Sequence, residues 1–366
     1  MQHCKVVVFE SPEIPLRLVD TLIPALKEQE ILVRNEYATL CRSDIYTYTG
    51  MRKEKNPTIL GHEIIGRIVS FGSNLKEFDL RGNALQVGDR ITWAIFASNP
   101  ESEYAKRGMP QKAADLFKYG HEQITPDSSL HGGLSEYTLL RKNTPVIKVE
   151  ENIPLPVSAI INCAVATVAG AIRTAGDLSE KKVLICGTGM LGIIACAMAK
   201  TKGAAEIYAM DTNPERLEVA KEFGASETCL IESGQKNLQK LFTEKTGKQI
   251  TIDVLIDFSG SPDAMENIMD LLGIGGTAVW IGSTFPQRKT QIDAEKVVRK
   301  ILTIKGLHNY NETDLDKAVT FIEEKHTSFP FEKLIYDGFT LNTVNEAFTH
   351  AVEKNNFRVG IKTVVS

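Results

Sequence analysis

Three glycines in the middle of the chain constrain its fold more than any other feature. Gly187, Gly189 and Gly192 form the pattern G-x-G-x-x-G directly after the apolar run "VLIC" and open an apolar helical stretch. The first glycine permits a tight turn, the second lets the backbone approach a pyrophosphate, and the third lets the helix pack on the strand. The helix N-terminus offers free N–H groups to phosphates. The pattern predicts a dinucleotide site at a strand–turn–helix unit.

The acidic residue that accompanies this fingerprint also stands at the expected spacing. Asp211 ends the next strand-like run, "EIYAMD", nineteen residues past Gly192. Its carboxylate can accept hydrogen bonds from ribose hydroxyls and would repel a 2′-phosphate, so we expect NAD rather than NADP. The alternative is a glycine-rich turn without a cofactor, and the register of strand, helix and Asp211 favours the dinucleotide.

The pattern of apolar and polar residues changes near residue 155, which indicates a domain boundary. Residues 1–156 hold short β-like runs separated by Gly, Pro, Asn and Asp, as in an antiparallel, partly barrel-like domain. Residues 157–300 alternate apolar strands with helical stretches, which predicts βαβ units and a doubly wound parallel sheet. Residues 301–366 return to the mixed style of the first part. The expected fold class is therefore α/β with two domains.

Composition argues against several classes of function. The chain has 366 residues and a net charge of −4, so bulk charge gives no reason to expect nucleic-acid binding. We find no apolar run of the ~20 residues that span a bilayer, and no signal-peptide pattern at the N-terminus. The six cysteines show no framework spacing, which favours reduced thiols and a cytoplasmic location.

An imidazole and a carboxylate stand side by side in the apolar stretch "ILGHEIIGRIV". Because buried charges are costly unless they are paired or bind a metal, His62 and Glu63 are either a hydrogen-bonded couple or part of a metal site. Upstream, "TLCRSD" offers Cys41 and Asp44, and "INCAVAT" offers Cys163. Zinc takes Cys, His and carboxylate ligands. A free cysteine such as Cys163 is, however, often simply a small buried apolar residue.

These motifs together resemble a zinc-dependent alcohol dehydrogenase of the medium-chain dehydrogenase/reductase superfamily. The runs "CRSD", "GHE", "LQVGDRI", "GGLSEYTLL", the cysteine of "INCAVAT", the glycine turn and "FRVGIKTVV" follow one another in that family's order over essentially the whole chain. The resemblance implies a GroES-like catalytic domain made of residues 1–156 and 301–366. It also implies a Rossmann NAD-binding domain at 157–300 and an active-site zinc.

The resemblance further implies how the metal would be held. Positions matching Cys41, His62 and Cys163 bind zinc in the family, and the position matching Glu63 is a direct or alternating ligand. The position matching Asp44 supports the histidine from behind. Zinc would act as a Lewis acid on an alcohol whose hydride passes to C4 of NAD⁺.

Other matched positions concern the proton and the cofactor. The position matching Ser43 hydrogen-bonds the substrate oxygen and passes on its proton, although Ser43 could instead cap a helix that begins at Asp44. Some relatives carry a histidine three residues after the serine, where this chain has Tyr46, and a phenol is a poorer base. Arg42 and Thr167 match cofactor-binding positions, with Thr167 against the nicotinamide ring.

One departure from the family concerns a second, structural zinc. Many relatives hold it on a lobe with four cysteines, whereas the equivalent positions here carry no thiol. These positions, aligned on Gly108, are Asn99, Ser102, Ala105 and Ala113. We therefore expect one zinc per chain and a lobe that folds by helix formation and packing.

The substrate is less constrained by the sequence. A set of basic residues either binds a phosphate or phosphonate or consists of solvated loop charges interleaved with acids such as Glu54. The set is Arg52, Lys53, Lys55, Arg107, Lys112 and Lys118. The lobe text "GMPQKAADLFKYGHE" resembles a subgroup associated with phosphonate metabolism, which makes a phosphonate- or phosphate-bearing alcohol or aldehyde the leading substrate and a polyol or cyclitol the second. His121 and Glu122 would lie at the pocket mouth or cap the lobe helix.

Two other functions stay open at this point. A zinc-free reductase of the same superfamily generally lacks the Cys and His ligands, and a nucleotide-binding protein without chemistry would have no need of a complete site. The expected partner is a small-molecule alcohol or carbonyl, with no nucleic acid and no membrane. Relatives usually pair through Rossmann edge strands, so we expect a homodimer or homotetramer through "GTAVWIGS" and a short edge strand near residue 290.

Overall fold

The computed structural model describes residues 2–74, 78–126, 128–232, 237–247 and 249–364, which divide into two compact units. Unit 1 comprises Met1–Ala166 and Asn311–Ser366, and unit 2 comprises Thr167–Tyr310. Both boundaries fall ten residues after those expected from the sequence. The first does so because α3 (Leu155–Ala159) packs on strands of unit 1. The second does so because β15 (Thr303–Gly306) pairs with a strand of unit 2.

Unit 1 is organised around a sheet in the order β16-β17-β3-β4-β5-β9, with β8 also paired to β3; its strands are antiparallel neighbours except β16 and β17, which are parallel. β3 and β4 are its centre, and their apolar residues Val33, Ile64 and Ile68 are buried in one core cluster with Trp93. The strands are β1 (His3–Val8), β2 (Arg17–Leu22), β3 (Ile31–Thr39), β4 (Glu63–Phe71), β5 (Arg90–Trp93), β6 (Phe96–Ala97), β7 (Phe117–Lys118), β8 (Tyr137–Leu140), β9 (Val146–Lys148), β16 (Ile335–Thr340) and β17 (Arg358–Lys362).

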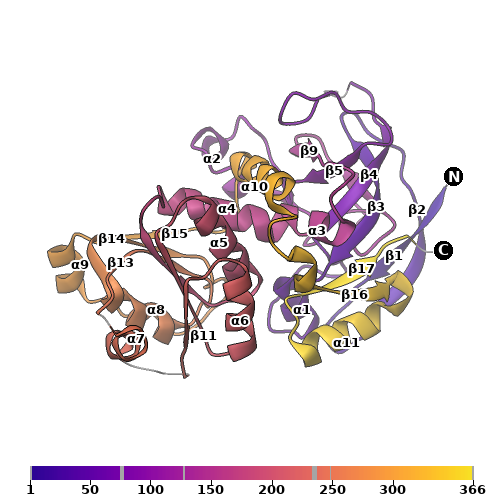
Figure 1. The fold of residues 1–366 in the computed structure, drawn as a ribbon. Coiled ribbons are helices and arrows are strands. Elements are labelled where there is room, and N and C mark those ends of the chain that lie inside the picture. The colour runs from indigo at the N-terminus through magenta and orange to yellow at the C-terminus, as the bar shows by residue number, and fades with distance from the viewer. Residues whose placement is uncertain (1, 75–77, 127, 233–236, 248, 365–366) are drawn as a thin grey trace. The chain divides into compact units, whose positions relative to one another are not determined.

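The helices of unit 1 cover this sheet and form the lobe. In α11 the residues Val344, Ala347, Phe348 and Ala351 recur at helical spacing and are buried, and the helix packs against β16 and β17 (Figure 1). The helical segments are α1 (Arg42–Tyr48), α2 (Glu103–Lys106), η1 (Pro110–Lys112), α3, the π-helical turn η2 (Ile161–Val165), α10 (Glu312–Lys325), η4 (Phe331–Leu334), η5 (Leu341–Thr343) and α11 (Val344–Lys354).

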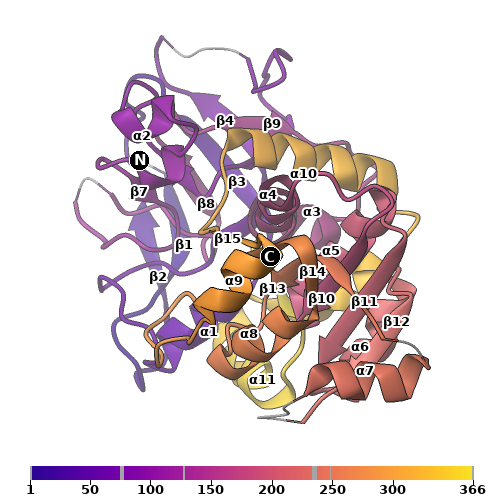
Figure 2. The same cartoon turned by 90° about the vertical axis from the view of Figure 1, so that its left-hand side faces the viewer.

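One strand of unit 1 has no clear signal in the sequence. β2 pairs antiparallel with β1 along its whole length, from His3 opposite Leu22 to Val8 opposite Arg17, and the two run side by side in Figure 2. The polar residues of "RLVDTL" give this strand no apolar signal, because its side chains are half-buried or exposed and none is fully buried.

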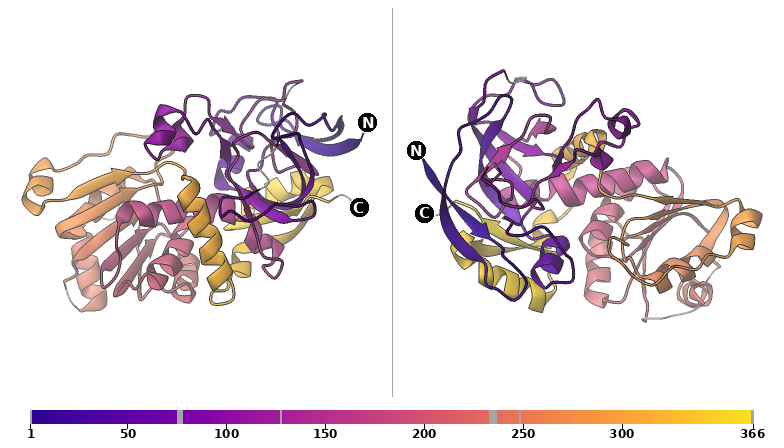
Figure 3. Two further views of the ribbon diagram at one scale, coloured as in Figure 1. Left: turned by 90° about the horizontal axis from the view of Figure 1, so that it is seen from above. Right: turned by 180° about the vertical axis from the view of Figure 1, so that it is seen from behind.

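Unit 2 contains a parallel sheet in the order β12-β11-β10-β13-β14-β15, which is the strand order of dinucleotide-binding folds. Helices lie on both faces of it (Figures 1 and 3). Its elements are α4 (Ala166–Ala175), β10 (Lys182–Cys186), α5 (Met190–Thr201), β11 (Glu206–Asp211), α6 (Pro214–Glu222), β12 (Glu227–Leu230), α7 (Leu238–Thr246), β13 (Ile252–Asp257), α8 (Pro262–Ile268), η3 (Met269–Leu271), β14 (Leu272–Trp280), α9 (Ala294–Lys300) and β15.

Two expectations from the sequence are wrong. The described residues around 290 form no strand, and the edge strand is β15 instead. The segment Leu155–Ala175 is 21 residues of helix, long and apolar enough to cross a membrane by length and composition, but 83% of its tested window is buried inside the protein. This apolar segment is not apparent from the sequence, because Pro156, Ser158 and Asn162 interrupt the apolar run without ending the helical segment.

Candidate metal and cofactor sites

Two thiols and an imidazole meet in unit 1. The sulfur atoms of Cys41 and Cys163 and a ring nitrogen of His62 all lie within 4.8 Å of one another. Cys41 follows β3 and His62 precedes β4. Because these strands are antiparallel neighbours, with Thr39 opposite Glu63, their ends lie together.

Asn162 ties the third ligand position to the other two. Its side-chain oxygen accepts a hydrogen bond from the Ile64 backbone N–H at 3.3 Å, and its amide donates to the His62 carbonyl at 3.1 Å. The side chain is fully buried. Sequence reasoning missed Asn162, although it stands beside Cys163 in the motif used to find that cysteine.

Asp44 organises the loops that carry Cys41 and His62. Its carboxylate accepts hydrogen bonds from the backbone N–H of Cys41 at 2.9 Å and of Gly61 at 3.1 Å. The same carboxylate lies 3.4 Å from Nδ1 of His62. A buried carboxylate behind the histidine fixes the orientation of the ring.

Ser43 does not cap a helix. α1 begins at Arg42 with Cys41 as its N-cap, and Asp44 completes the capping box. The Oγ of Ser43 lies 3.5 Å from Nε2 of His62, the ring nitrogen that does not face Asp44. Tyr46 lies on the same helix, where the Arg42 guanidinium is 6.0 Å from its ring centroid.

Electrostatics at the cluster favour positive charge. Burial lowers the pKa of His62, but the nearby Asp44 and Cys41 outweigh it and raise that pKa to about 10. A hydrogen bond with Cys163 and the charges of Arg358 and His62 hold the pKa of Cys41 well below its usual value, and the same pairing raises that of Cys163. The field that stabilises a proton here would also stabilise a metal cation.

Glu63 lies outside this cluster. Its Oε2 accepts from Arg358 Nε at 2.5 Å and from the Thr39 hydroxyl at 2.7 Å, and its Oε1 accepts from Arg358 Nη2 at 2.8 Å. Both carboxylate oxygens are therefore engaged, and the structure does not bring Glu63 to the ligand position implied by the resemblance. Sequence reasoning missed Arg358, which stands in the terminal run "FRVGIK".

The donor set fits zinc. Two cysteine sulfurs and one histidine nitrogen leave a fourth position open, as in catalytic zinc sites with Cys₂His coordination. Nδ1 of His62 faces the Asp44 carboxylate at 3.4 Å, which leaves Nε2 for a metal, and the His62 side chain is 3% exposed. Cys41, His62 and Cys163 would hold the ion.

The positions of the lobe that carry cysteines in many relatives have other uses here. Ser102 caps α2 through its hydroxyl, which accepts from the Ala105 N–H at 3.3 Å. The Asn99 side chain accepts from the Glu101 N–H at 2.9 Å, and Ala113 is buried. The lobe is thus held by capping and packing at these positions.

His121 lies beside the cluster and caps no helix. Its ring is 4.9 Å from that of His62, centroid to centroid, and its Nδ1 is 2.9 Å from Glu54 Oε1. The lobe helix α2 is instead capped by Ser102 and Arg107. Glu122 points to Lys55, with which it forms an ion pair at 2.9 Å.

In unit 2 the glycine turn has the geometry that the fingerprint requires. Gly187 has φ +87°, and a Cβ there would lie 2.8 Å from the Ser259 backbone nitrogen. A Cβ on Gly192 would lie 2.0 Å from the Gly187 carbonyl oxygen, whereas nothing lies within 4 Å of one on Gly189. The open space at Gly189 is where a pyrophosphate would approach the N-terminus of α5.

Asp211 supports this turn and borders a cavity. Its carboxylate accepts from the Thr188 N–H at 2.6 Å and from the Asn213 N–H at 2.9 Å. The cavity, of about 230 Å³, lies where the strand order reverses between β10 and β13. Its described lining includes Asp211, Glu232 and Asp263 and contains no lysine or arginine.

Thr167 and Arg42 are the two remaining residues that the sequence assigned to cofactor binding. Thr167 is buried at the first residue of unit 2. Arg42 donates a hydrogen bond to the side chain of Asn355 within unit 1.

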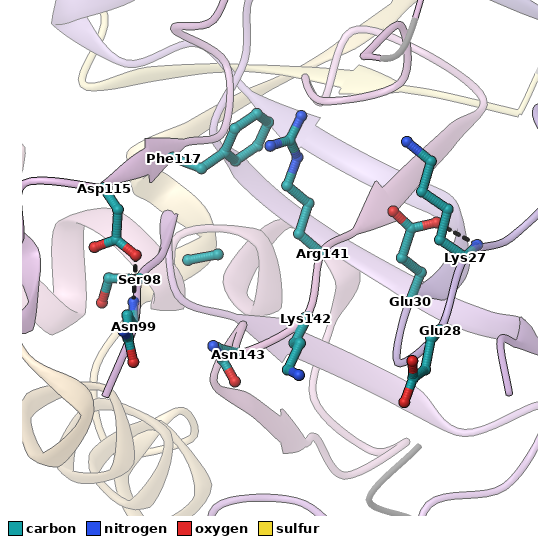
Figure 4. Close-up of a pocket in the computed structure, with 11 residues that line it drawn as sticks. Lys27, Glu28, Glu30, Ser98, Asn99, Asp115, Phe117, Arg141, Lys142 and Asn143 are labelled. Carbon is teal, nitrogen blue, oxygen red and sulfur yellow. Dashed lines mark hydrogen bonds between the residues drawn. The ribbon is translucent and has the colours of Figure 1, made fainter. Parts of the chain in front are cut away.

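Another cavity, of about 570 Å³, lies in unit 1, and its lining includes none of Cys41, His62 and Cys163 (Figure 4). Arg141 stands in it with its guanidinium carbon 3.8 Å from the ring centroid of Phe117. Lys27, Lys142, Glu28, Glu30 and Asp115 also line it, so its charges are mixed.

Comparison with known proteins matches both parts of the chain. The alcohol dehydrogenase GroES-like domain matches residues 27–151, and the zinc-binding dehydrogenase family matches residues 191–324. An L-threonine 3-dehydrogenase of Alteromonas mediterranea is 26% identical over 355 residues, which are 95% of this chain and 93% of that protein.

Solved structures are similar over the full length. An alcohol dehydrogenase of Thermotoga maritima has a TM-score of 0.91 and 26% identity and covers 99% of this chain and 100% of its own. An Escherichia coli alcohol dehydrogenase complexed with NADH has a TM-score of 0.84 over 99% of this chain and 100% of its own. At 23% identity, the latter shows a common fold alone.

Proposed function

Because this chain belongs to the zinc-containing alcohol dehydrogenases of the medium-chain dehydrogenase/reductase superfamily, we propose that it is an NAD-linked enzyme with one catalytic zinc. It interconverts an alcohol and an aldehyde or ketone. The observation that carries this proposal is the approach of Cys41, His62 and Cys163 to within 4.8 Å. Zinc held there would supply a Lewis acid for the substrate oxygen.

The protein's own residues would position the substrate and move the proton. Ser43 Oγ lies 3.5 Å from Nε2 of the ligand His62, and it would accept the hydroxyl proton and pass it toward Tyr46. NAD⁺ held at the turn of Gly187, Gly189 and Gly192 would supply the hydride acceptor, so that alcohol and NAD⁺ would give carbonyl, NADH and a proton. Asp44 and Asn162 hold the ligand loops in place. Glu63 holds Arg358 behind Cys41 instead of binding the metal at rest.

Metal analysis and one substitution test this proposal. We expect about one zinc per chain in the purified protein, and we expect Cys41→Ser to abolish both zinc retention and NADH formation while NAD binding persists. Cys4→Ser is the matched control, because Cys4 is a buried thiol of the same unit outside the cluster. Unchanged turnover in Cys41→Ser would refute the zinc mechanism.

The cofactor preference is proposed from the acidic lining near the glycine turn. A 2′-phosphate would meet Asp211 and Glu232 without a basic residue among the described lining. We expect kcat/KM to favour NAD over NADP, and we expect Asp211→Asn to reduce that ratio. Asp263→Asn is the control because Asp263 lines the same cavity without contacting the glycine turn through a hydrogen bond.

The substrate we propose is an alcohol or aldehyde bearing a phosphonate or phosphate, with a polyol or cyclitol as the second candidate. Support comes from Arg52, which forms an ion pair with Glu54, the carboxylate that lies 2.9 Å from His121 beside the cluster. The L-threonine 3-dehydrogenases to which the chain is similar are named for a substrate that also carries a hydroxyl and an anionic group. A panel of neutral, polyhydroxylated and phosphonate alcohols assayed for NADH formation separates the candidates.

We further propose a cytoplasmic homodimer or homotetramer formed through the β15 edge of unit 2. An unpaired strand edge invites pairing with another chain. Ile274, Val298 and Ile301 lie in or beside the edge elements and are 82%, 76% and 71% exposed. Light scattering on Val298→Lys, which we expect to weaken association, tests this.

A further inference from the structure

A buried carboxylate lies at the carboxyl end of β13, next to the glycine turn of unit 2. Asp257 is the last residue of β13, and it stands in register with Cys186, which ends the neighbouring strand β10 and precedes Gly187. The Asp257 side chain is fully buried, outside both the metal cluster and the described lining of the cofactor cavity. Because a carboxylate is costly to bury unless hydrogen-bond donors surround it, its partners show which part of the fold it holds.

Asp257 holds the loop that follows β13. Its Oδ1 accepts hydrogen bonds from the Ser259 hydroxyl at 2.6 Å and from the Ser259 N–H at 3.3 Å. Its Oδ2 accepts from the Gly260 N–H at 3.0 Å. Hydrogen bonds to a carboxylate are stronger than those between neutral groups, so this one side chain fixes the path of the loop at two successive residues.

The Ser259 hydroxyl connects this carboxylate to two neighbouring elements. Besides donating to Asp257, it accepts from the Ser261 N–H at 3.2 Å and from the Cys186 thiol at 3.8 Å. Ser261 is the N-cap of α8, and Cys186 ends β10. A hydroxyl offers one proton and two lone pairs, and the protein uses all three. Ser259 therefore lines the cofactor cavity as part of its wall and has no hydrogen bond left for a ligand.

The same loop packs directly against the glycine turn. A Cβ on Gly187 would lie 2.8 Å from the Ser259 nitrogen and 3.0 Å from its Cα, so the two backbones approach this closely only because Gly187 has no side chain. On the other side of the loop, Gly260 has φ +67°, and a Cβ there would lie 2.5 Å from the Gly282 carbonyl oxygen. The loop is thus confined between the segments that follow β10 and β14, and its position limits that of the turn.

We infer that Asp257 is a positioning residue for the cofactor: it fixes Ser259, and Ser259 holds the glycine turn in the place where a dinucleotide pyrophosphate would approach. This inference rests on the proposed NAD-linked function and adds a second carboxylate to that site. Asp211 holds the turn from β11 by accepting the Thr188 N–H, and it also lines the cavity. Asp257 acts from β13 and, being fully buried, only through groups of the protein.

Amide hydrogen exchange on the zinc-loaded full-length protein tests this role without a cofactor. We expect Ser259→Ala to speed exchange in the peptide of residues 184–190 about tenfold, the effect of losing one hydrogen bond to a charged group. Ser226→Ala is the matched control, because it removes a hydroxyl that accepts the Ile207 N–H at 3.0 Å near the amino end of β11. Ser259→Thr keeps the hydroxyl at an exposed position and should exchange as wild type does. Unchanged exchange in Ser259→Ala would overturn the inference.

Calorimetric titration with NAD links the turn to the cofactor. We expect the Kd for NAD to rise about threefold or more in Ser259→Ala and Asp257→Asn, because affinity falls with the fraction of molecules whose turn is in the binding position. Ser226→Ala and Ser259→Thr should bind as wild type does, and all four variants should keep their zinc. Faster exchange with an unchanged Kd would refute the positioning role. If wild type binds neither NAD nor NADP, the proposed function fails, and exchange alone decides whether Ser259 holds the turn.

Discussion

The Arg358 guanidinium donates two hydrogen bonds to the Glu63 carboxylate, through Nε at 2.5 Å and Nη2 at 2.8 Å. Nη2 also lies 3.5 Å from the sulfur of Cys41. The side chain of Arg358 is 4% exposed and that of Glu63 is 0% exposed. This ion pair joins β17, near the C-terminus of the chain, to the start of β4, and it brings a positive charge behind one of the three cluster residues.

Removing one member of this pair should destabilise the protein strongly. Glu63→Ala leaves Arg358 buried without its counter-charge, and we expect a loss of about 3–5 kcal/mol in the free energy of unfolding. The double variant Glu63→Leu with Arg358→Met should recover part of that loss, since apolar residues of similar volume often replace buried pairs at little cost. Urea unfolding measures both, and a single variant as stable as wild type would contradict the role assigned to the pair.

Asp44→Asn should weaken metal retention more than it weakens the fold. One carboxylate oxygen that now accepts an N–H from Cys41 or Gly61 becomes a donor, and the charge behind His62 is lost. We expect zinc affinity to fall about 10–100-fold, measured by competition with a chromogenic chelator. The control is Asp115→Asn, an exposed carboxylate that accepts from the Asn99 N–H, which should leave zinc affinity unchanged.

The two glycines of the cofactor turn should respond differently to alanine. In Gly192→Ala the new Cβ meets the Gly187 carbonyl oxygen at 2.0 Å, and a backbone atom there cannot move without breaking the turn. We expect unit 2 to be destabilised and NAD binding to be lost.

In Gly189→Ala the Cβ meets nothing within 4 Å, so the fold should lose only about 1 kcal/mol as an N-cap change. The methyl group would stand in the space proposed for the pyrophosphate, and the Kd for NAD should rise at least tenfold. Thermal unfolding and NAD titration of both variants distinguish the two effects. Equal stability of the two variants would be inconsistent with this packing.

His131 should make the stability of the protein depend on pH. Burial lowers its pKa to about 4, and neither ring nitrogen has a hydrogen-bond partner in the structure. The unfolded chain, with a histidine pKa of about 6.5, binds more protons than the folded one between these values, so stability falls as pH drops through this window.

Between pH 7 and pH 5 we expect this residue to account for a loss of about 2 kcal/mol. His131→Gln should remove that amount from the pH dependence of the free energy of unfolding measured in urea. His3→Gln, at an exposed histidine, should not. An unchanged pH dependence in His131→Gln would show that folding does not shift the pKa of this ring.

The architecture of unit 2 was predictable because local signals agree with one another. Glycine spacing, apolar strands and the helix that follows them all operate within a few residues, so Gly187, Gly192 and Asp211 could be assigned to one turn from the sequence. The cluster of Cys41, His62 and Cys163 was predicted through its family resemblance, and the three donors do lie together.

Contacts between distant segments could not be predicted in the same way. Glu63 was expected at the metal, but Arg358, 295 residues away in the chain, engages its carboxylate in the structure. Six basic residues looked equivalent in the sequence, yet Arg52 pairs with Glu54, whose side chain is 12% exposed, while Lys55 and Arg107 form ion pairs with side chains that are 65% and 59% exposed.

By itself the sequence determined the order of the elements, the dinucleotide turn and the identity of the soft donors, because these depend on short-range periodicity and residue chemistry. Only the tertiary structure decided which carboxylates are already engaged and which cations stand beside the donors. The reason is physical: the pairing of a buried charge depends on the partners that folding brings to it, and those partners come from strands and loops far apart in the chain.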